Sequence, residues 1–306
     1  MKKIFSFFSV ITISITHFVH DIYTSFLAPL LPLLIEKFDI SLKMASLLSI
    51  VRNIPSLLNP LFGLMADKVS LRYFIIIAPS ISAITMSLLG SAPNYSILLL
   101  LLFITGIGSA LFHVSAPVMI KQVSGEKRGL GMSFFRSIIK SSLTLYLPTY
   151  LTKSGSSLMS AGIALSIFQF SGATGTFLSG HFSDKIGRKN MLLLLSIMVP
   201  PLSFGFLLTS GIIKMLFLIA LGLFIFGSTP VFLALVHDQK SSRPSFINGL
   251  YMAANFIVSS LSVLIIGTLG DTFGLKKTFL LAASLSILSI PFAMMVKNNK
   301  MEHADS

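Results

Sequence analysis

The feature that most constrains the fold is a succession of long apolar runs separated by short polar stretches. Residues 95–120 and 190–210, for example, contain no Asp, Glu, Lys or Arg. A run of about 18 or more apolar residues is long enough to cross a bilayer as a helix. Only 11% of all residues are charged, whereas soluble domains carry about 25%. The sequence therefore predicts an all-α membrane protein that crosses the bilayer repeatedly.

Ten runs have the length of a membrane span. The first follows Lys2 and Lys3 in the manner of a signal peptide, but no small-residue cleavage site follows it, so it is expected to remain as a span. The ten predicted spans cover residues 10–35, 43–66, 73–91, 95–120, 132–152, 157–182, 190–210, 213–236, 245–268 and 277–296.

The basic residues predict the orientation of these spans. With a cytoplasmic N-terminus, fifteen of the 23 Lys and Arg residues lie in inside segments, six lie in outside segments and two lie within spans. Because inside loops carry the excess of positive charge, both termini are predicted to be cytoplasmic in a multi-pass protein of the plasma or inner membrane. The same loops account for the net charge of +13, so a nucleic-acid partner is not expected.

One phrase, G-x-x-x-D-x-x-[GS], occurs at the ends of three predicted spans. Its first Gly permits close helix approach, its Asp can accept hydrogen bonds from the N–H groups of the next helix, and its second Gly suits a turn with positive φ. Two copies would lie inside and the third outside, as inverted repeats in a transporter would place them. The predicted latch residues are Gly63, Asp67, Lys68, Arg72, Gly180, Asp184, Lys185, Gly187, Arg188, Gly267, Asp271 and Gly274.

The phrase GHFSDKIGRKN at 180–190 resembles the loop signature of the major facilitator superfamily. GLMADKVSLR is a weaker copy, with Ser70 where the family usually has Gly. HFVHDIYTSFLAPLLP, GIGSALFHVSAP and LYLPTYL resemble the fosmidomycin-resistance-like branch. The resemblance implies a two-bundle secondary transporter, often one that exports small molecules as protons enter.

The chain departs from that family in length, because the family has two bundles of six spans. The sequence before residues 131–140 is similar to the family's first four spans, and the sequence after these residues is similar to the family's seventh span onward. The expected division is 1–131, with about four spans, and 132–306, with about six. A natural contraction, a functional homo-oligomer and a degenerate copy remain open. The alternative to a transporter is a non-transporting partner subunit or an inactive remnant.

A group of titratable residues in the predicted spans is the candidate for proton coupling. His17, His20 and Asp21 lie close together on the first span, where residues three and four apart are neighbours, and His113 lies in the fourth span beside Phe112. A charged group at the bilayer centre costs about 2.5–3.5 kcal/mol, so it usually faces a cavity or a partner. Imidazoles titrate near neutral pH. The alternative is that these side chains only bond to neighbouring helices near a membrane surface.

Five polar residues in the spans are candidates for substrate binding. Arg136 and Lys140 would contact an anionic substrate, and Arg52 would touch substrate or pair with Asp21, unless these side chains snorkel to the lipid headgroups. Gln169 and Asn248 would face the same cavity, unless they form hydrogen bonds between helices. Four glycines inside spans are expected instead to permit close helix packing: Gly106, Gly108, Gly172 and Gly175.

The sequence gives no support for an enzyme. It contains no cysteine, no nucleophile–base set, no clustered metal ligands and no Walker loop, so no metal or cofactor is expected. The predicted partners are the lipid bilayer, a small-molecule substrate and protons. The predicted function is secondary active transport by alternating access, with proton-coupled efflux of a drug or small organic anion.

Overall fold

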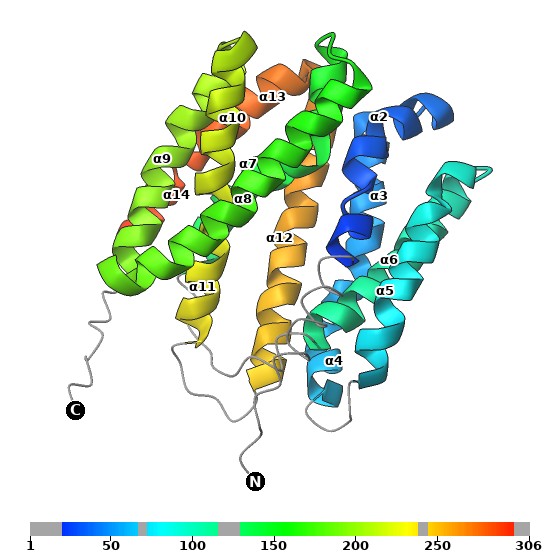
Figure 1. The fold of residues 1–306 in the computed structure, drawn as a ribbon, viewed down its shortest axis with the longest axis horizontal. Helices are drawn as coiled ribbons and strands as arrows, with labels where there is room; N and C mark the ends of the chain where they lie inside the picture. The colour runs from blue at the N-terminus through cyan, green and yellow to red at the C-terminus, as the bar shows by residue number, and fades with distance from the viewer. Residues whose placement is uncertain (1–19, 67–71, 116–128, 238–243, 297–306) are drawn as a thin grey trace.

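The computed structural model describes residues 20–66, 72–115, 129–237 and 244–296, and every regular element in these ranges is helical (Figure 1). A helical turn at 20–24 precedes the first long element. The elements are α2 Leu27–Phe38, α3 Leu42–Asn53, η1 Ile54–Leu58, α4 Asn59–Ala66, α5 Arg72–Ser87, η2 Leu89–Ser91, α6 Tyr95–Ser115, α7 Gly129–Lys153, α8 Leu158–Ile186, α9 Arg188–Leu208, α10 Gly211–Phe226, α11 Ser228–His237, α12 Pro244–Phe273, α13 Leu275–Ser286 and α14 Ser289–Met294.

Proline divides the second predicted span into three pieces. Pro55 lies at the start of η1, and Pro60 lies at the start of α4. Proline lacks the N–H that continues an α-helix and clashes with the preceding turn, so the chain passes through a short 3₁₀ segment between α3 and α4. This break lies directly after Arg52 and Asn53, which the fold places beside a cavity.

Two sharp joints between long helices depend on glycine. Gly187 joins α8 to α9 with φ 88°, and Gly274 joins α12 to α13 with φ 78°. Side chains with a Cβ rarely adopt positive φ, so the turn role predicted for these two glycines is confirmed. The joint at Gly187 lies at the lower end of the molecule in Figure 1, and the joint at Gly274 lies at the upper end.

The helices form two groups that meet along α12 and α7. The first group contains α3, η1 and α4 packed on α6, which also packs on α5. The second contains α8 and α9 packed on α10, with α13 and α14 against α7 and α9. α12 packs along α3, η1 and α4, and α7 packs against α2 as well as α8 and α12. α7 therefore lies at the centre of the molecule.

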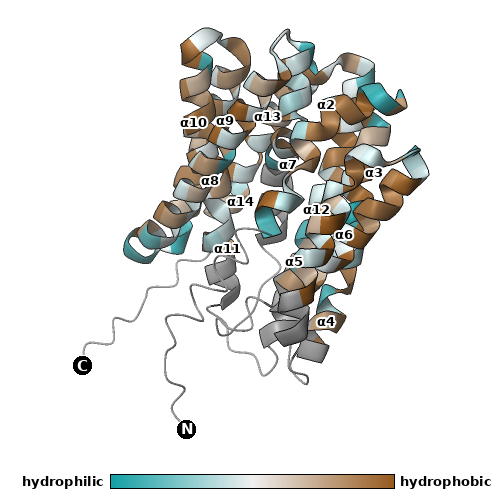
Figure 2. Cartoon of the chain, turned by 45° about the vertical axis from the view of Figure 1, so that its right-hand side comes forward, coloured by the Kyte–Doolittle hydropathy of each residue, from teal (hydrophilic) through white to brown (hydrophobic). Residues whose placement is uncertain are grey.

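The surface is that of a protein embedded in lipid. Large apolar side chains such as Phe170 and Phe177 are 77% and 78% exposed, and Figure 2 shows long hydrophobic, brown stretches on α8, α9 and α10. Many buried positions carry Ser in place of an apolar residue. Ser203 and Ser262, for example, donate to carbonyls four residues earlier in their own helices, which satisfies these two hydroxyls away from water. This inside-out distribution is typical of a membrane protein.

Six helical stretches in the described residues are long and apolar enough to cross a membrane by length and composition. They are Tyr95–Phe112, Leu158–Ile186, Arg188–Leu208, Gly211–Phe232, Gly249–Phe273 and Leu275–Met294. α2 has only 12 described residues, α3 and α4 are separated by η1, and α5 has 16 residues. The count of ten spans therefore stays a prediction.

Two of the predicted packing glycines lie at very close helix crossings. A Cβ at Gly106 of α6 would lie 2.0 Å from the backbone oxygen of Arg52, and a Cβ at Gly175 of α8 would lie 1.9 Å from that of Leu223. Neither crossing has room for a larger residue, so the packing role predicted for these positions is confirmed. The first crossing holds the backbone of Arg52 in place.

Candidate functional site

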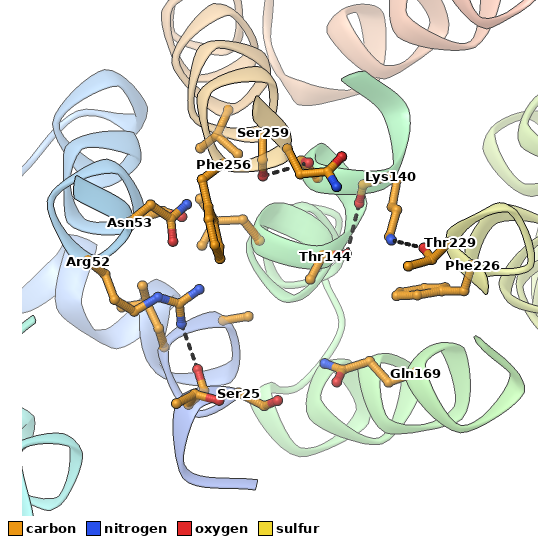
Figure 3. A pocket seen from close by; sticks show the side chains of 18 of the residues that line it. Ser25, Arg52, Asn53, Lys140, Thr144, Gln169, Phe226, Thr229, Phe256 and Ser259 are labelled. Carbon is orange, nitrogen blue, oxygen red and sulfur yellow. Dashed lines mark hydrogen bonds between the residues drawn. The ribbon is translucent and has the colours of Figure 1, made fainter. Parts of the chain in front are cut away.

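A cavity of about 410 Å³ lies where the two groups of helices meet. It is lined from α2, α3, α7, α8, α10, α11 and α12, so both groups contribute to its wall (Figure 3). Its lining residues are Thr24, Ser25, Leu27, Ala28, Ser49, Arg52, Asn53, Lys140, Ser141, Thr144, Leu145, Gln169, Phe226, Ser228, Thr229, Phe232, Tyr251, Asn255, Phe256, Ser259 and Val263.

Arg52 lies on the α3 wall of this cavity. Its Nη1 atom donates a hydrogen bond of 2.6 Å to the carbonyl oxygen of Thr24, which is in the turn before α2. Thr24 in turn donates to the carbonyl of Asp21 at 3.2 Å. The guanidinium has five N–H donors in a fixed fork, so this bond orients the group and leaves other donors for a ligand.

Lys140 lies across the cavity from Arg52, on α7 (Figure 3). Its Nζ atom lies 3.1 Å from Oγ1 of Thr229 and 4.8 Å from the centre of the Phe226 ring. Both partners flank the break between α10 and α11, and Gly227 lies between them. Lys140 thus holds its ammonium against a hydroxyl and an aromatic face, an arrangement that favours a cation.

The rest of the cavity wall is mainly uncharged and polar. Gln169 projects from α8 toward the cavity (Figure 3), and Ser141 and Ser259 share a hydrogen bond of 2.9 Å between α7 and α12. Asn53 donates to Ser260 at 3.5 Å. No acidic side chain lines the cavity among the residues that the structure describes, so the charges of Arg52 and Lys140 make it electropositive.

The candidates for proton coupling are only partly described. His20 is fully buried, with its ring stacked on Phe112 at 4.6 Å between centroids. Asp21 is exposed, and it is not among the cavity-lining residues. His17 and the side chain of His113 lie outside the described part of the chain. The structure therefore brings His20 next to the helix that carries His113.

The predicted role of Asp184, which was to accept hydrogen bonds from the backbone N–H groups of the next helix, is wrong. Its Oδ1 atom lies 2.6 Å from Nη1 of Arg188 in an ion pair, and the cap of α9 at Gly187 carries no side-chain bond. Arg188 also donates to Ser183 at 3.1 Å. Because the positive φ of Gly187 turns the chain sharply, the carboxylate meets the first side chain of α9 instead of its backbone. Lys185 is exposed. A Cβ at Gly180 would lie 3.8 Å from Pro230, an ordinary contact distance, so the close approach of helices predicted for this glycine is not found.

Asp271 does bond to a helix N-terminus, but the predicted partner is wrong. Its Oδ1 and Oδ2 atoms accept hydrogen bonds of 2.8 Å from the N–H groups of Leu42 and Lys43, at the start of α3. The next helix, α13, has no side-chain cap. The carboxylate therefore connects the two groups of helices, because α12 runs beside α3 along its length.

The other predicted site residues cannot be placed in the same detail. Asp67 and Lys68 lie outside the described residues. The structure describes the backbone but not the side chains of Arg72 in α5, Arg136 in α7 and Asn248 in α12, and it places Gly63 in α4 without describing its surroundings.

Several residues of the cavity wall were missed from the sequence. Asn255 and Ser259 are four apart on α12, and two polar residues on one face of an apolar run were a usable signal. Phe226 and Thr229 gave no such signal, because aromatic and hydroxyl residues are common in apolar spans. Only the fold places them beside Lys140.

A polar cavity between two groups of helices, inside a chain with an apolar outer surface, defines a multi-pass membrane protein of the transporter class rather than an enzyme. The family model described as Major Facilitator Superfamily matches residues 13–140 and 134–263. The chain therefore belongs to the major facilitator superfamily, and the family predicted from the loop signature is confirmed.

Individual relatives agree with this assignment. Over 125 residues the chain is 26% identical to the fosmidomycin resistance protein of Escherichia coli (strain K12), and over 127 residues it is 25% identical to the uncharacterized MFS-type transporter YfnC of Bacillus subtilis (strain 168). These matches cover 40% and 41% of this chain but only 31% of each relative. The crystal structure of the nucleoside transporter NupG (D323A mutant) shares the fold, with a TM-score of 0.72 and 15% identity over 94% of this chain and 99% of that one.

Proposed function

We propose that the protein is a secondary active transporter that moves a small organic anion through the cavity between its two groups of helices. The observation that carries the proposal is the charge of the cavity wall, where Arg52 and Lys140 face each other and no acidic residue among the described lining opposes them. Binding of an anion offsets the cost of holding two cations away from bulk water. Its polar head would lie among hydroxyl and amide groups such as Gln169.

Alternating access supplies the mechanism. The units 1–131 and 132–306 would rock against each other, so that the cavity opens to one side of the membrane and then to the other. Arg52 belongs to the first unit and Lys140 to the second, so an anion bound to both would draw the two walls together. Both termini would be cytoplasmic in the plasma or inner membrane.

Proton coupling is proposed for His20 and Asp21, with His17 and His113. Arg52 bonds to the carbonyl of Thr24, three residues after Asp21. A change of charge at Asp21 would act on Arg52 through this helical turn. The name of the E. coli relative contains the word resistance, which favours export as the direction of transport.

The test is a flux assay in proteoliposomes with an imposed pH gradient and a panel of small carboxylates and phosphonates, each paired with an uncharged ester. We expect flux of the anions and not of the esters. Lys140→Gln should lower anion flux at least about tenfold, because a charge-assisted bond contributes about 1.5–3 kcal/mol. Lys277→Gln is the matched control, because Lys277 is exposed on α13 and outside the cavity.

Two results would contradict the proposal. Equal flux of anions and esters would remove the anion preference, and unchanged anion flux in Lys140→Gln would remove Lys140 as a ligand. Asp21→Asn is expected to abolish the response to the pH gradient; a retained response would end the proton role of Asp21. Absence of flux for every compound would favour the alternative of a non-transporting partner subunit or remnant.

A further inference from the structure

A half-buried lysine lies against two aromatic rings in the second group of helices. The Nζ atom of Lys214, near the start of α10, lies 4.8 Å from the centre of the Tyr150 ring and 5.1 Å from the centre of the Phe206 ring. It also donates a hydrogen bond of 3.5 Å to the hydroxyl of Tyr150. Because ring faces attract an ammonium group, Lys214 is held in one place instead of extending freely into the headgroup region.

A second lysine lies near the first. Lys276, in the first turn of α13, is close enough to Lys214 for the two charges to repel each other. Tyr150 also packs edge-on against Phe279, which is one turn after Lys276 on α13. Among the described residues neither lysine forms an ion pair, and the carboxylate of Asp271, five positions before Lys276, bonds instead to the start of α3. Two neighbouring cations without a carboxylate favour an anion beside them.

The backbone adds positive charge at the same place. Lys214 and Lys276 lie at the starts of α10 and α13, and neither helix has a side-chain cap or an acidic residue in its first turn. The first N–H groups of a helix have no partner within it, and the helix dipole gives that end a partial positive charge. These two helix ends therefore add to the attraction that the lysines exert on an anion.

Apolar side chains beside Lys214 are exposed. They are Leu208 at the end of α9, and Ile212, Ile213 and Leu216 at the start of α10. The start of α10 lies at the upper end of the molecule in Figure 1, as does the joint at Gly274. A lysine at the end of a span reaches the level of the lipid headgroups, while exposed apolar side chains contact the acyl chains. The lysines and the apolar side chains together fit the two parts of a lipid molecule.

We propose that Lys214 and Lys276 form a binding site for the phosphate of an anionic phospholipid. The phosphate would lie between the two ammonium groups, and the acyl chains would lie along the exposed apolar side chains of α10. A bound headgroup would offset the repulsion between the lysines and so stabilise the packing of α10 and α13 around Tyr150. None of these residues lines the cavity, so the site is separate from the proposed path of transport and does not depend on it.

The test measures lipid binding to the full chain by native mass spectrometry in detergent. Phosphatidylglycerol is titrated against the protein, and phosphatidylcholine, whose phosphate is compensated by a positive charge, is titrated in parallel. Inorganic phosphate, added at the concentration of the lipid, distinguishes a lipid site from a site for the free ion. We expect phosphatidylglycerol to bind more tightly than phosphatidylcholine and to stay bound in the presence of inorganic phosphate.

Lys214→Gln and Lys276→Gln should each weaken the binding of phosphatidylglycerol about fivefold, which is the effect of one lysine near an anionic lipid surface. Lys214→Arg keeps the charge and should retain the native affinity. Lys276 is exposed, so Lys276→Gln tests the site even where Lys214→Gln loosens the aromatic packing. Lys43→Gln is the matched control, because it removes the same charge from an exposed residue of α3, in the first group of helices.

The proposal is overturned if Lys214→Gln and Lys276→Gln bind phosphatidylglycerol as tightly as the native chain. It is equally overturned if Lys43→Gln weakens binding as much as they do, because that result describes attraction to the overall positive charge. Equal affinity for the two lipids would also overturn it. Displacement of phosphatidylglycerol by inorganic phosphate at equal concentration would assign the lysines to a free ion and end the lipid site.

Discussion

The crossing of α8 and α10 at Gly175 gives a sharp test of the packing. Gly175→Ala places a Cβ 1.9 Å from the backbone oxygen of Leu223, and backbone atoms cannot rotate aside. To restore ordinary contact at 3.4 Å, α8 and α10 must separate locally by about 1.5 Å. Overpacking of this kind costs about 1–3 kcal/mol. The cavity should also widen, because Gln169 of α8 and Phe226 of α10 both line it.

Gly162→Ala in the same helix is the matched control. Among the described residues, no atom of another helix lies within 4 Å of the Cβ position at Gly162, so the change should stabilise α8 by up to about 1 kcal/mol through helix propensity alone. Unfolding is measured by far-UV circular dichroism during an SDS titration in mixed micelles, since the chain has no tryptophan for fluorescence. Equal stability of the two variants would refute the argument that the α8–α10 crossing depends on the absence of a side chain.

Two further changes test the helix ends. Asp184→Asn should change the free energy of unfolding by less than about 0.5 kcal/mol, because the pair with Arg188 is an i,i+4 surface pair whose carboxylate is 59% exposed; a loss above 1 kcal/mol in the same SDS titration would contradict this. Ser41→Ala should cost about 1 kcal/mol, because Ser41 accepts a bond of 3.2 Å from the N–H of Met44 at the start of α3. An unchanged unfolding curve would show that the hydrogen bonds that Asp271 accepts are enough to hold this turn without Ser41.

The sequence predicted the class of fold and the glycine turns at two of its joints, because both depend on neighbouring residues. Apolar run length predicts helices in lipid, and the turns at Gly187 and Gly274 follow from glycine within a short phrase. Arg52, Lys140 and Gln169 were found as polar residues in apolar runs, and all three line the cavity. A charged or amide group in such a run is costly unless a cavity or partner receives it, so one sequence is enough to nominate it.

Partners that are distant in the chain could not be predicted in the same way. Asp271 was assigned to the next helix, a few residues away, yet it binds the N–H of Leu42, which is 229 positions away. The pattern correctly indicated a carboxylate suited to a helix N-terminus, but nothing in it says which N-terminus lies within reach. Gly249 shows the same limit more strongly. It was not singled out from the sequence. Its close contact with α4, where a Cβ would lie 2.5 Å from the backbone oxygen of Asn59, depends on α12 running beside α4. A polar residue in an apolar run is recognisable by its own chemistry, whereas a glycine at a helix crossing is defined by what lies opposite it.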